Sequence, residues 1–205
     1  KDTSIDLLSL DSAFTAELAE AQVLAPVPED LAPAYSKDIA PAALDAARYE
    51  GSLVVAPWWF DPQLLWYRGK TAERAGLDTT KASSWTDVIA GAQRLGLTIQ
   101  IDDPDGSGLS EWISTLIAGS GGKLVTGTTR SARVGLDTAA GRAAAGVVEF
   151  YSESKVGPGP SRDALETFAG PTGGFLLGPS SVVSDPALAA IAAGYDRAWD
   201  TILDS

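Results

Sequence analysis

The chain of 205 residues contains no cysteine, no histidine and no methionine. These absences exclude disulfide bonds, thiolate and imidazole nucleophiles, zinc sites built from those ligands, and the usual general base near neutral pH. No apolar run approaches the length that spans a bilayer. The chain also opens without a basic and then apolar leader, so we expect a signal peptide to be absent from it or already removed.

Positive charge is scarce as well. The chain has 15 Lys and Arg residues against 27 Asp and Glu residues, which gives a formal net charge of −12. A nucleic acid backbone or an anionic membrane would repel such a chain on average, so we do not expect nucleic acid as a partner. A hydrophobic content of 45% with 20% charged residues is ordinary for a globular protein with a packed core.

Short apolar runs alternate with helical patterns along the chain. This alternation indicates an α/β protein in which helices cover a mainly parallel sheet. Ser84 and Asp87 form the signature of a helix N-terminus in a capping-box relation. The predicted strands are 5–10, 53–56, 63–67, 97–101 and 175–177. The predicted helices are 13–22, 36–49, 71–75, 84–95, 109–118, 137–154 and 162–168, with a closing helical segment that begins at Asp185 and Pro186.

The acidic loop 101–108 partly matches a calcium-binding loop. Asp103 and Asp105 fall at ligand positions, but Ile101 and Trp112 stand where the first ligand and the bidentate glutamate belong. We favour a solvated acidic turn before a helix, which the helix dipole also stabilises.

The glycine-rich segment 119–124 partly matches a phosphate-binding loop. Ile117 replaces the first glycine of that motif, and Leu124 replaces the Ser or Thr that follows its lysine. We interpret the segment as a glycine-rich helix end, and we expect neither a metal ion nor a cofactor.

Half of the chain's 6 tryptophans lie in the segment 56–68. Trp66 shares one face of a predicted strand with Leu64 and is expected to pack inward or at a lobe junction. Trp58 and Trp59 lie in a proline-bracketed, irregular stretch with Asp61. An aromatic face attracts the C–H face of a pyranose, and the side chains of Asp61 and Gln63 can bond its hydroxyls, so this segment suggests a sugar site.

Two other functions remain open from the residues alone. A glycoside-processing enzyme needs two carboxylates flanking a sugar bond, and the candidates are Asp11, Asp61, Asp103, Asp105 and Glu111. A sugar-sensing or protein-interaction module would present Trp58 and Trp59 as an exposed patch.

Several blocks occur together in one order: 6–11, 14–21, 49–53, 56–61, 64–68, 75–77 and Trp85. In this order and spacing they resemble family 1 extracellular solute-binding proteins of carbohydrate ABC transporters, with the maltose- and trehalose-binding branch the most similar. The resemblance implies a periplasmic-binding-protein-like fold with two α/β lobes around a cleft that closes by a hinge motion. The implied domains are part of a first lobe at 1–62, a crossover at 63–68, a second lobe at 69–178 and a C-terminal helical segment at 179–205. The first lobe is expected to be incomplete.

The resemblance also implies which residues contact the ligand and what the protein does. The best candidates are Asp11, Trp59, Asp61 and Gln63, followed by Trp58, Ser107, Glu111 and Trp112. Relatives often place an aromatic residue after a later cleft strand, where this chain has Gly178 and Pro179. The implied function is non-enzymatic binding of a disaccharide such as trehalose or maltose, for delivery to ABC permease subunits. We expect an extracytoplasmic monomer that meets the membrane only through a lipid anchor or the permease.

Overall fold

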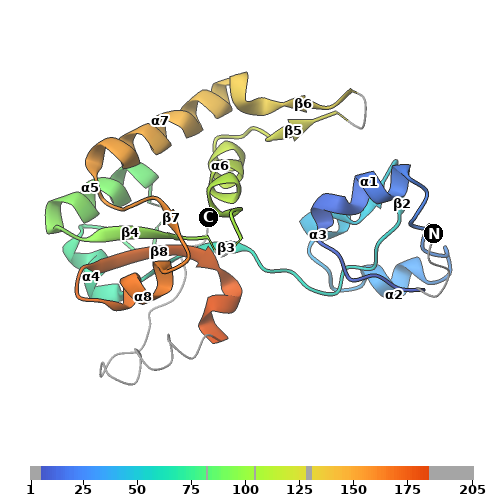
Figure 1. The fold of residues 1–205 in the computed structure, drawn as a ribbon, viewed down its shortest axis with the longest axis horizontal. Helices are drawn as coiled ribbons and strands as arrows, with labels where there is room; N and C mark the ends of the chain where they lie inside the picture. The colour runs from blue at the N-terminus through green and yellow to red at the C-terminus, as the bar shows by residue number, and fades with distance from the viewer. Residues whose placement is uncertain (1–5, 82, 104, 128–130, 185–205) are drawn as a thin grey trace. The chain divides into compact units, whose positions relative to one another are not determined.

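The computed structural model describes residues 6–81, 83–103, 105–127 and 131–184, which fall into two compact units. Of these residues, the large unit holds 61–127 and 132–184, and the small unit holds 6–60 and Ser131. Each is described by itself, and Figure 1 shows the elements of both. None of the helices in the described residues has the length and apolar character needed to cross a membrane.

A four-stranded sheet forms the centre of the large unit (Figure 1). Its order is β3 (Gln63–Tyr67), β8 (Gly173–Pro179), β4 (Thr98–Asp102) and β7 (Pro160–Ser161). Strand β4 pairs in parallel with β8 and β7, whereas β3 pairs antiparallel with β8. The sheet is therefore mixed, and the predicted mainly parallel arrangement holds only for the part around β4.

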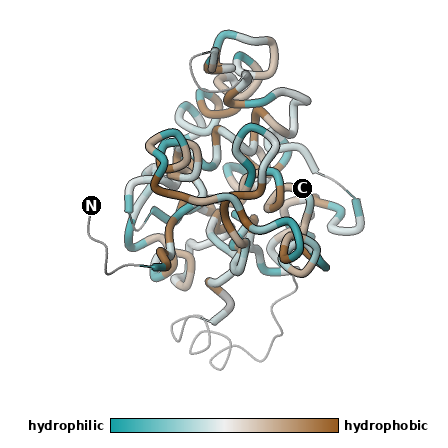
Figure 2. Tube along the Cα trace, turned by 90° about the vertical axis from the view of Figure 1, so that its right-hand side faces the viewer, coloured by the Kyte–Doolittle hydropathy of each residue, from teal (hydrophilic) through white to brown (hydrophobic). Residues whose placement is uncertain are grey.

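Helices cover both faces of this sheet. Helices α5 (Trp85–Leu95), α6 (Gly108–Gly119) and α7 (Ala139–Ser154) contribute to the main core on one face, with α4 (Gly69–Arg74) beside them. The short α8 (Ala164–Ala169) and the 3-10 turn η4 (Ser180–Ser184) contribute to a smaller cluster on the other face. Tubes coloured by hydropathy show apolar and polar stretches alternating along the chain, as expected when each helix buries one stripe (Figure 2).

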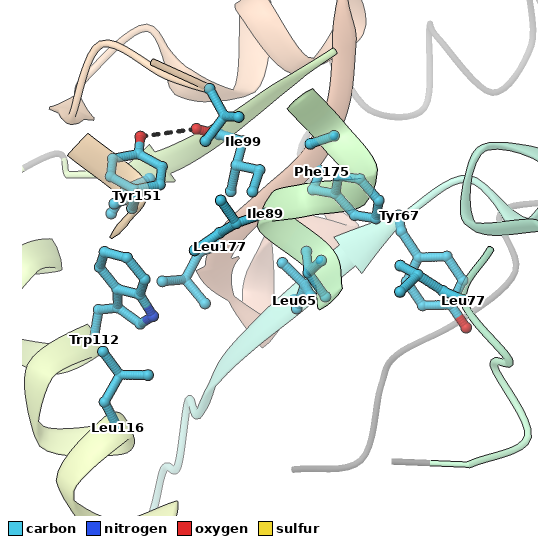
Figure 3. Close-up of a cluster of buried hydrophobic side chains, with 14 of the residues drawn as sticks. Leu65, Tyr67, Leu77, Ile89, Ile99, Trp112, Leu116, Tyr151, Phe175 and Leu177 are labelled. Atoms are coloured by element: carbon cyan, nitrogen blue, oxygen red, sulfur yellow. Dashed lines mark hydrogen bonds between the residues drawn. The ribbon is translucent and has the colours of Figure 1, made fainter. Parts of the chain in front are cut away.

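Strand β3 shows how the sequence divides between the two clusters. Leu65 and Tyr67 enter the main core, which Figure 3 shows, whereas Trp66 and Leu64 belong to the smaller cluster. This is the alternation expected of a strand with both faces covered. The prediction that Trp66 packs inward is confirmed, because only 5% of its surface is exposed.

Helix α5 begins and ends where its sequence signals predict. The Ser84 hydroxyl accepts a hydrogen bond from the Asp87 backbone N–H at 3.1 Å and donates one to the Asp87 carboxylate at 2.7 Å. Gly96 ends the helix in the left-handed conformation with φ 63°. These local contacts explain why the predicted helix 84–95 is confirmed.

The small unit contains short elements and little buried surface. They are η1 (Ser12–Phe14), α1 (Thr15–Glu20), α2 (Ala32–Ser36), α3 (Pro41–Ala46) and a hairpin of β1 (Arg48–Tyr49) with β2 (Ser52–Leu53). Among the described residues of this unit, only Thr15, Ala47 and Leu53 are buried. A unit with so few buried side chains gains little stabilisation from the hydrophobic effect.

Four elements predicted for the small unit are missing, broken or shorter in the structure. The described part of the predicted strand 5–10 has no strand partner, and Leu7 and Leu8 are 91% and 52% exposed. The predicted helix 36–49 is broken, because Asp38 has φ 59° and Pro41 starts α3. The predicted strand 53–56 is reduced to β2, which ends at Leu53. The predicted helix 13–22 is shorter in the structure, where η1 and then α1 cover residues 12–20.

The other predicted elements that the structure describes lie in the large unit and are confirmed, most of them with shifted ends. The hairpin of β5 (Val125–Thr126) and β6 (Arg133–Val134) and the turn η3 (Gly135–Asp137) precede α7. Helix α7 starts two residues later than predicted because the Thr138 hydroxyl caps it by accepting from the Gly141 N–H at 3.0 Å. The closing segment predicted from Asp185 lies outside the described residues.

Candidate functional site

The sheet of the large unit brings several polar segments to one edge. The carboxyl ends of the parallel strands β4 and β8 lie at the same edge, and β3 starts there because it runs antiparallel to β8 with Gln63 opposite Pro179. We call this edge the carboxyl edge and define it by residues 61–63, by 103 and 105–111 after β4, and by 179–181. In open α/β sheets, ligands bind outside the carboxyl ends of the strands.

Asp61 is held at the carboxyl edge by two serines. Its Oδ1 accepts hydrogen bonds from the Ser180 hydroxyl at 2.6 Å and the Ser181 backbone N–H at 2.9 Å, and its Oδ2 accepts one from the Ser181 hydroxyl at 2.6 Å. Partial burial alone would raise the pKa of Asp61, but these hydrogen bonds outweigh it and hold the pKa below its ordinary value. Asp61 is therefore a carboxylate with both oxygens engaged.

Gln63 lies next to the start of α6. Its Nε2 donates to the Gly108 carbonyl at 3.3 Å, while its Oε1 is buried without a hydrogen-bond partner. A buried acceptor without a partner costs free energy unless water or a ligand group satisfies it. The Gln63 amide oxygen is thus an unpaired acceptor that surrounding atoms cover.

The residues after β4 form a capped turn. Asp103 accepts from the Gly108 N–H at 2.8 Å, Asp105 accepts from the Ser107 N–H at 3.0 Å, and the Ser107 hydroxyl donates to Glu111 at 2.8 Å. The pKa of Asp105 is lowered mainly by hydrogen bonds from Ser107, and the positive charge of Arg162 makes the smallest contribution. This matches the predicted acidic turn before a helix, and the described residues contain no group of three acidic side chains placed to hold a metal ion.

A Cβ on Gly108 would lie 2.3 Å from the Asp102 carbonyl oxygen, so only glycine allows the turn to close this tightly against β4. Gly108 therefore determines where α6 starts relative to the carboxyl edge.

Exposed aromatic rings come just before Asp61 in the chain. Trp58, Trp59 and Phe60 are 81%, 65% and 59% exposed. Trp59 precedes Asp61 by two residues, so their Cα atoms lie within about 7 Å of each other. Large exposed aromatic rings are typical of a binding surface, and this exposure of Trp58 and Trp59 is what the protein-interaction alternative predicts.

The structure places Trp112 and Asp11 differently from the other candidates. Trp112 is only 1% exposed and packs edge-on against Trp85, with ring centroids 5.1 Å apart. It packs in the same way against Tyr151, with ring centroids 5.3 Å apart (Figure 3). No face of its ring is open to a ligand, so Trp112 is a core residue. Asp11 is exposed in the small unit, where its carboxylate caps η1 by accepting from the Ala13 N–H at 2.7 Å.

The sequence did not point to Ser180 and Ser181, although they bond Asp61. The only available signal was a pair of hydroxyl residues directly after a buried strand and Pro179. Hydroxyls are common in turns, so that signal does not identify a partner for a carboxylate elsewhere in the chain.

Residues 1–201 match the family model described as bacterial extracellular solute-binding protein, and the chain belongs to this family. Similar solved structures include UgpB from Mycobacterium tuberculosis in complex with glycerophosphocholine, with 18% identity and a TM-score of 0.62 over 88% of this chain and 47% of that one. The GacH receptor of Streptomyces glaucescens, solved unliganded and with acarbose, has 19% identity and a TM-score of 0.59 over 89% and 48%. Maltose-bound MalE3 of T. maritima has 22% identity and a TM-score of 0.61 over 86% and 47%.

At such low sequence identities, the structural similarity to these proteins establishes the fold and not the ligand. It confirms the predicted periplasmic-binding-protein-like α/β fold. The chain spans about half the length of these proteins.

Proposed function

We propose that this chain is the ligand-contacting part of a non-enzymatic, extracytoplasmic protein that binds a carbohydrate for an ABC importer. Family membership supports the solute-binding role. The observation that carries the carbohydrate assignment is that Trp58 and Trp59 are followed in the chain by Asp61 and Gln63 within five residues, whereas the exposure of the two rings would suit a protein-interaction module equally well. Flat apolar rings beside hydrogen-bonding groups match the two kinds of surface that a sugar presents.

Each candidate residue has a distinct part in this proposal. Trp59, with Trp58 beside it, stacks on the sugar ring. The Gln63 amide oxygen, which is buried without a partner in the structure, accepts from a ligand hydroxyl once the groups that cover it move aside. Ser107 and Glu111 already bond each other and add further polar contacts at the start of α6. Asp11 is retained as a candidate from the small unit.

The wider biology follows the family and is likewise a proposal. Residues 1–62 would belong to the first lobe, 63–68 to the crossover, 69–178 to the second lobe and 179–205 to a C-terminal segment. The partners would be permease subunits of the importer, and a disaccharide such as maltose or trehalose would be the ligand. The protein would act as a monomer, held at the membrane by a lipid anchor or by the permease alone.

The glycoside-processing alternative gains no support from the carboxylates at the edge. A general acid for this reaction needs a raised pKa. The pKa values of Asp61 and Asp105 are instead lowered by hydrogen bonds from neighbouring serines. Asp103 and Glu111 also accept hydrogen bonds within the turn that starts α6.

The first test is a titration of tryptophan fluorescence with maltose and trehalose, with glucose as the monosaccharide control. We expect a saturable change with a disaccharide, and Trp59→Ala should weaken binding by about 3- to 10-fold, the worth of one aromatic contact. Tyr35→Ala is the matched control, because Tyr35 is an exposed aromatic residue of helix α2 and should leave binding unchanged. A flat response to both disaccharides from folded protein would contradict the proposal.

A further inference from the structure

We infer that Asp61 is a positioning residue that clamps the carboxyl edge together, and that it is not itself a ligand contact. The reason for this inference is that both carboxylate oxygens of Asp61 already accept hydrogen bonds from residues of the same chain. The sequence prediction gave Asp61 a direct role in sugar binding, so the two views make different predictions.

The contacts join the start of β3 to the segment that follows β8 at several points. Both Asp61 oxygens accept bonds from Ser180 and Ser181 at 2.6 to 2.9 Å. The Ser180 N–H also donates to the Pro62 carbonyl at 2.9 Å. Further along β3, the Trp66 indole N–H donates to the Pro179 carbonyl at 3.3 Å.

The chemistry of these contacts favours a carboxylate. Three donors converge on one side chain, and an ionised carboxylate accepts all of them on its two oxygens. An asparagine at position 61 could keep its oxygen in the place of Oδ1, where it would still accept from the Ser180 hydroxyl and the Ser181 N–H. Its NH₂ would then face the Ser181 hydroxyl, which would have to stop donating and accept instead, and all three bonds would lose the charge of the acceptor.

The clamp determines which groups remain free at the carboxyl edge. The Ser180 and Ser181 hydroxyls are used by Asp61, so they do not have their hydrogens free for a ligand. Because Asp61 holds the start of β3 to the segment that follows β8, polar recognition is left to Gln63, Ser107 and Glu111. This last step rests on the proposed function, whereas the clamp itself is measurable without any ligand.

The clamp is tested by NMR on the 205-residue chain through the Ser181 amide and the Trp66 indole signals. With wild-type protein we expect the Ser181 amide to titrate with the Asp61 carboxylate, at a pKa below the ordinary aspartate value of about 3.9. Asp61→Asn should remove this titration and shift the Trp66 indole signal. Glu149→Gln, an exposed carboxylate change on α7, should do neither.

Ser181→Ala provides a milder second variant that keeps the backbone N–H. It should raise the Asp61 pKa toward the ordinary value, because one of the bonds to the charged form is lost. A Ser181 amide that ignores the Asp61 titration in folded wild-type protein would overturn the clamp. So would an Asp61 pKa that Ser181→Ala leaves unchanged.

Maltose titrations separate positioning from direct contact. If Asp61 acts through the serines, Asp61→Asn and Ser181→Ala each weaken maltose binding by at least about fivefold, and the double variant binds no more weakly than Asp61→Asn alone. If Asp61 contacts the sugar directly, Ser181→Ala leaves the affinity nearly unchanged while Asp61→Asn reduces it, and the inference fails. Wild-type protein that binds no maltose contradicts the proposed ligand, and the NMR result still decides the clamp.

Discussion

At the residue scale, the hydrogen bond between Tyr49 and Glu20 ties β1 to α1 in the small unit. The Tyr49 hydroxyl donates to the Glu20 carboxylate. This bond, and to a lesser extent desolvation and the negative charges of Glu20 and Glu50, raises the pKa of Tyr49 to about 12. Removing the phenolic proton would leave two negatively charged oxygens side by side, so the neutral phenol is favoured.

Glu20→Gln should therefore lower the Tyr49 pKa toward the ordinary tyrosine value of about 10. Ring ¹³C shifts of labelled tyrosine, followed with pH, measure this directly. Because the folded-state pKa is raised, the stabilisation is fully present below about pH 10 and is lost as the pH rises toward 12. The unfolding midpoint of the wild type should fall more steeply in that window than that of Glu20→Gln. An unchanged Tyr49 pKa in the variant would show that Glu20 is not the cause.

At the scale of helices and strands, packing depends on how closely two neighbouring backbones can approach each other. Gly91 lies inside α5, where a Cβ would come within 2.9 Å of both the Cβ and the carbonyl oxygen of Ala75, at the end of α4. Gly146 lies inside α7, where an added Cβ meets nothing within 4 Å. Glycine thus has a packing role at position 91 and none at position 146.

We expect Gly91→Ala to destabilise the protein and Gly146→Ala to stabilise it. Alanine favours a helix over glycine by about 1 kcal/mol, and this gain alone acts at Gly146. At Gly91 the forced separation of α4 and α5 costs about 1 to 3 kcal/mol and outweighs that gain. Urea unfolding of the two variants measures the difference. A Gly91→Ala protein as stable as Gly146→Ala would mean that α4 moves away at no cost.

At the scale of the whole molecule, the two units differ in how much they bury. The main core of the large unit includes fully buried Ile89, Ile117 and Phe175, and the Tyr151 hydroxyl donates to the Ile99 carbonyl at 3.0 Å within it (Figure 3). The described part of the small unit has no comparable cluster and exposes Leu7, Phe14 and Trp58, among others. Local stability follows buried apolar contacts, so the small unit should open more readily.

Amide hydrogen exchange tests this difference. Backbone amides of β4 and β8 should exchange orders of magnitude more slowly than those of α1 and α3, because opening the sheet requires exposing the main core. Limited proteolysis should cut the small unit first and leave a fragment beginning near residue 61. Equal protection in both units would show that the small unit is stabilised by more than its own buried side chains.

Prediction from sequence succeeded where the determining contacts are local. Helix α5 was predicted with its cap because Ser84 and Asp87 are three residues apart and bond each other. The strand β3 was predicted over its full length from its apolar and β-favouring residues. The predicted strand at 5–10 failed because a strand exists only if another strand pairs with it, and no residue in the segment specifies that partner.

The sequence by itself determined helices α4 to α8 and strands β3, β4 and β8 of the large unit, the absence of cysteine and histidine chemistry, and the family to which the chain belongs. Only the tertiary structure decided that Trp112 lies in the core while Trp59 is exposed, and that Asp61 bonds serines 119 and 120 residues away. The physical reason is the range of each signal. Caps and periodicity act over a few residues, whereas these contacts depend on β3 pairing with β8, which no local pattern encodes.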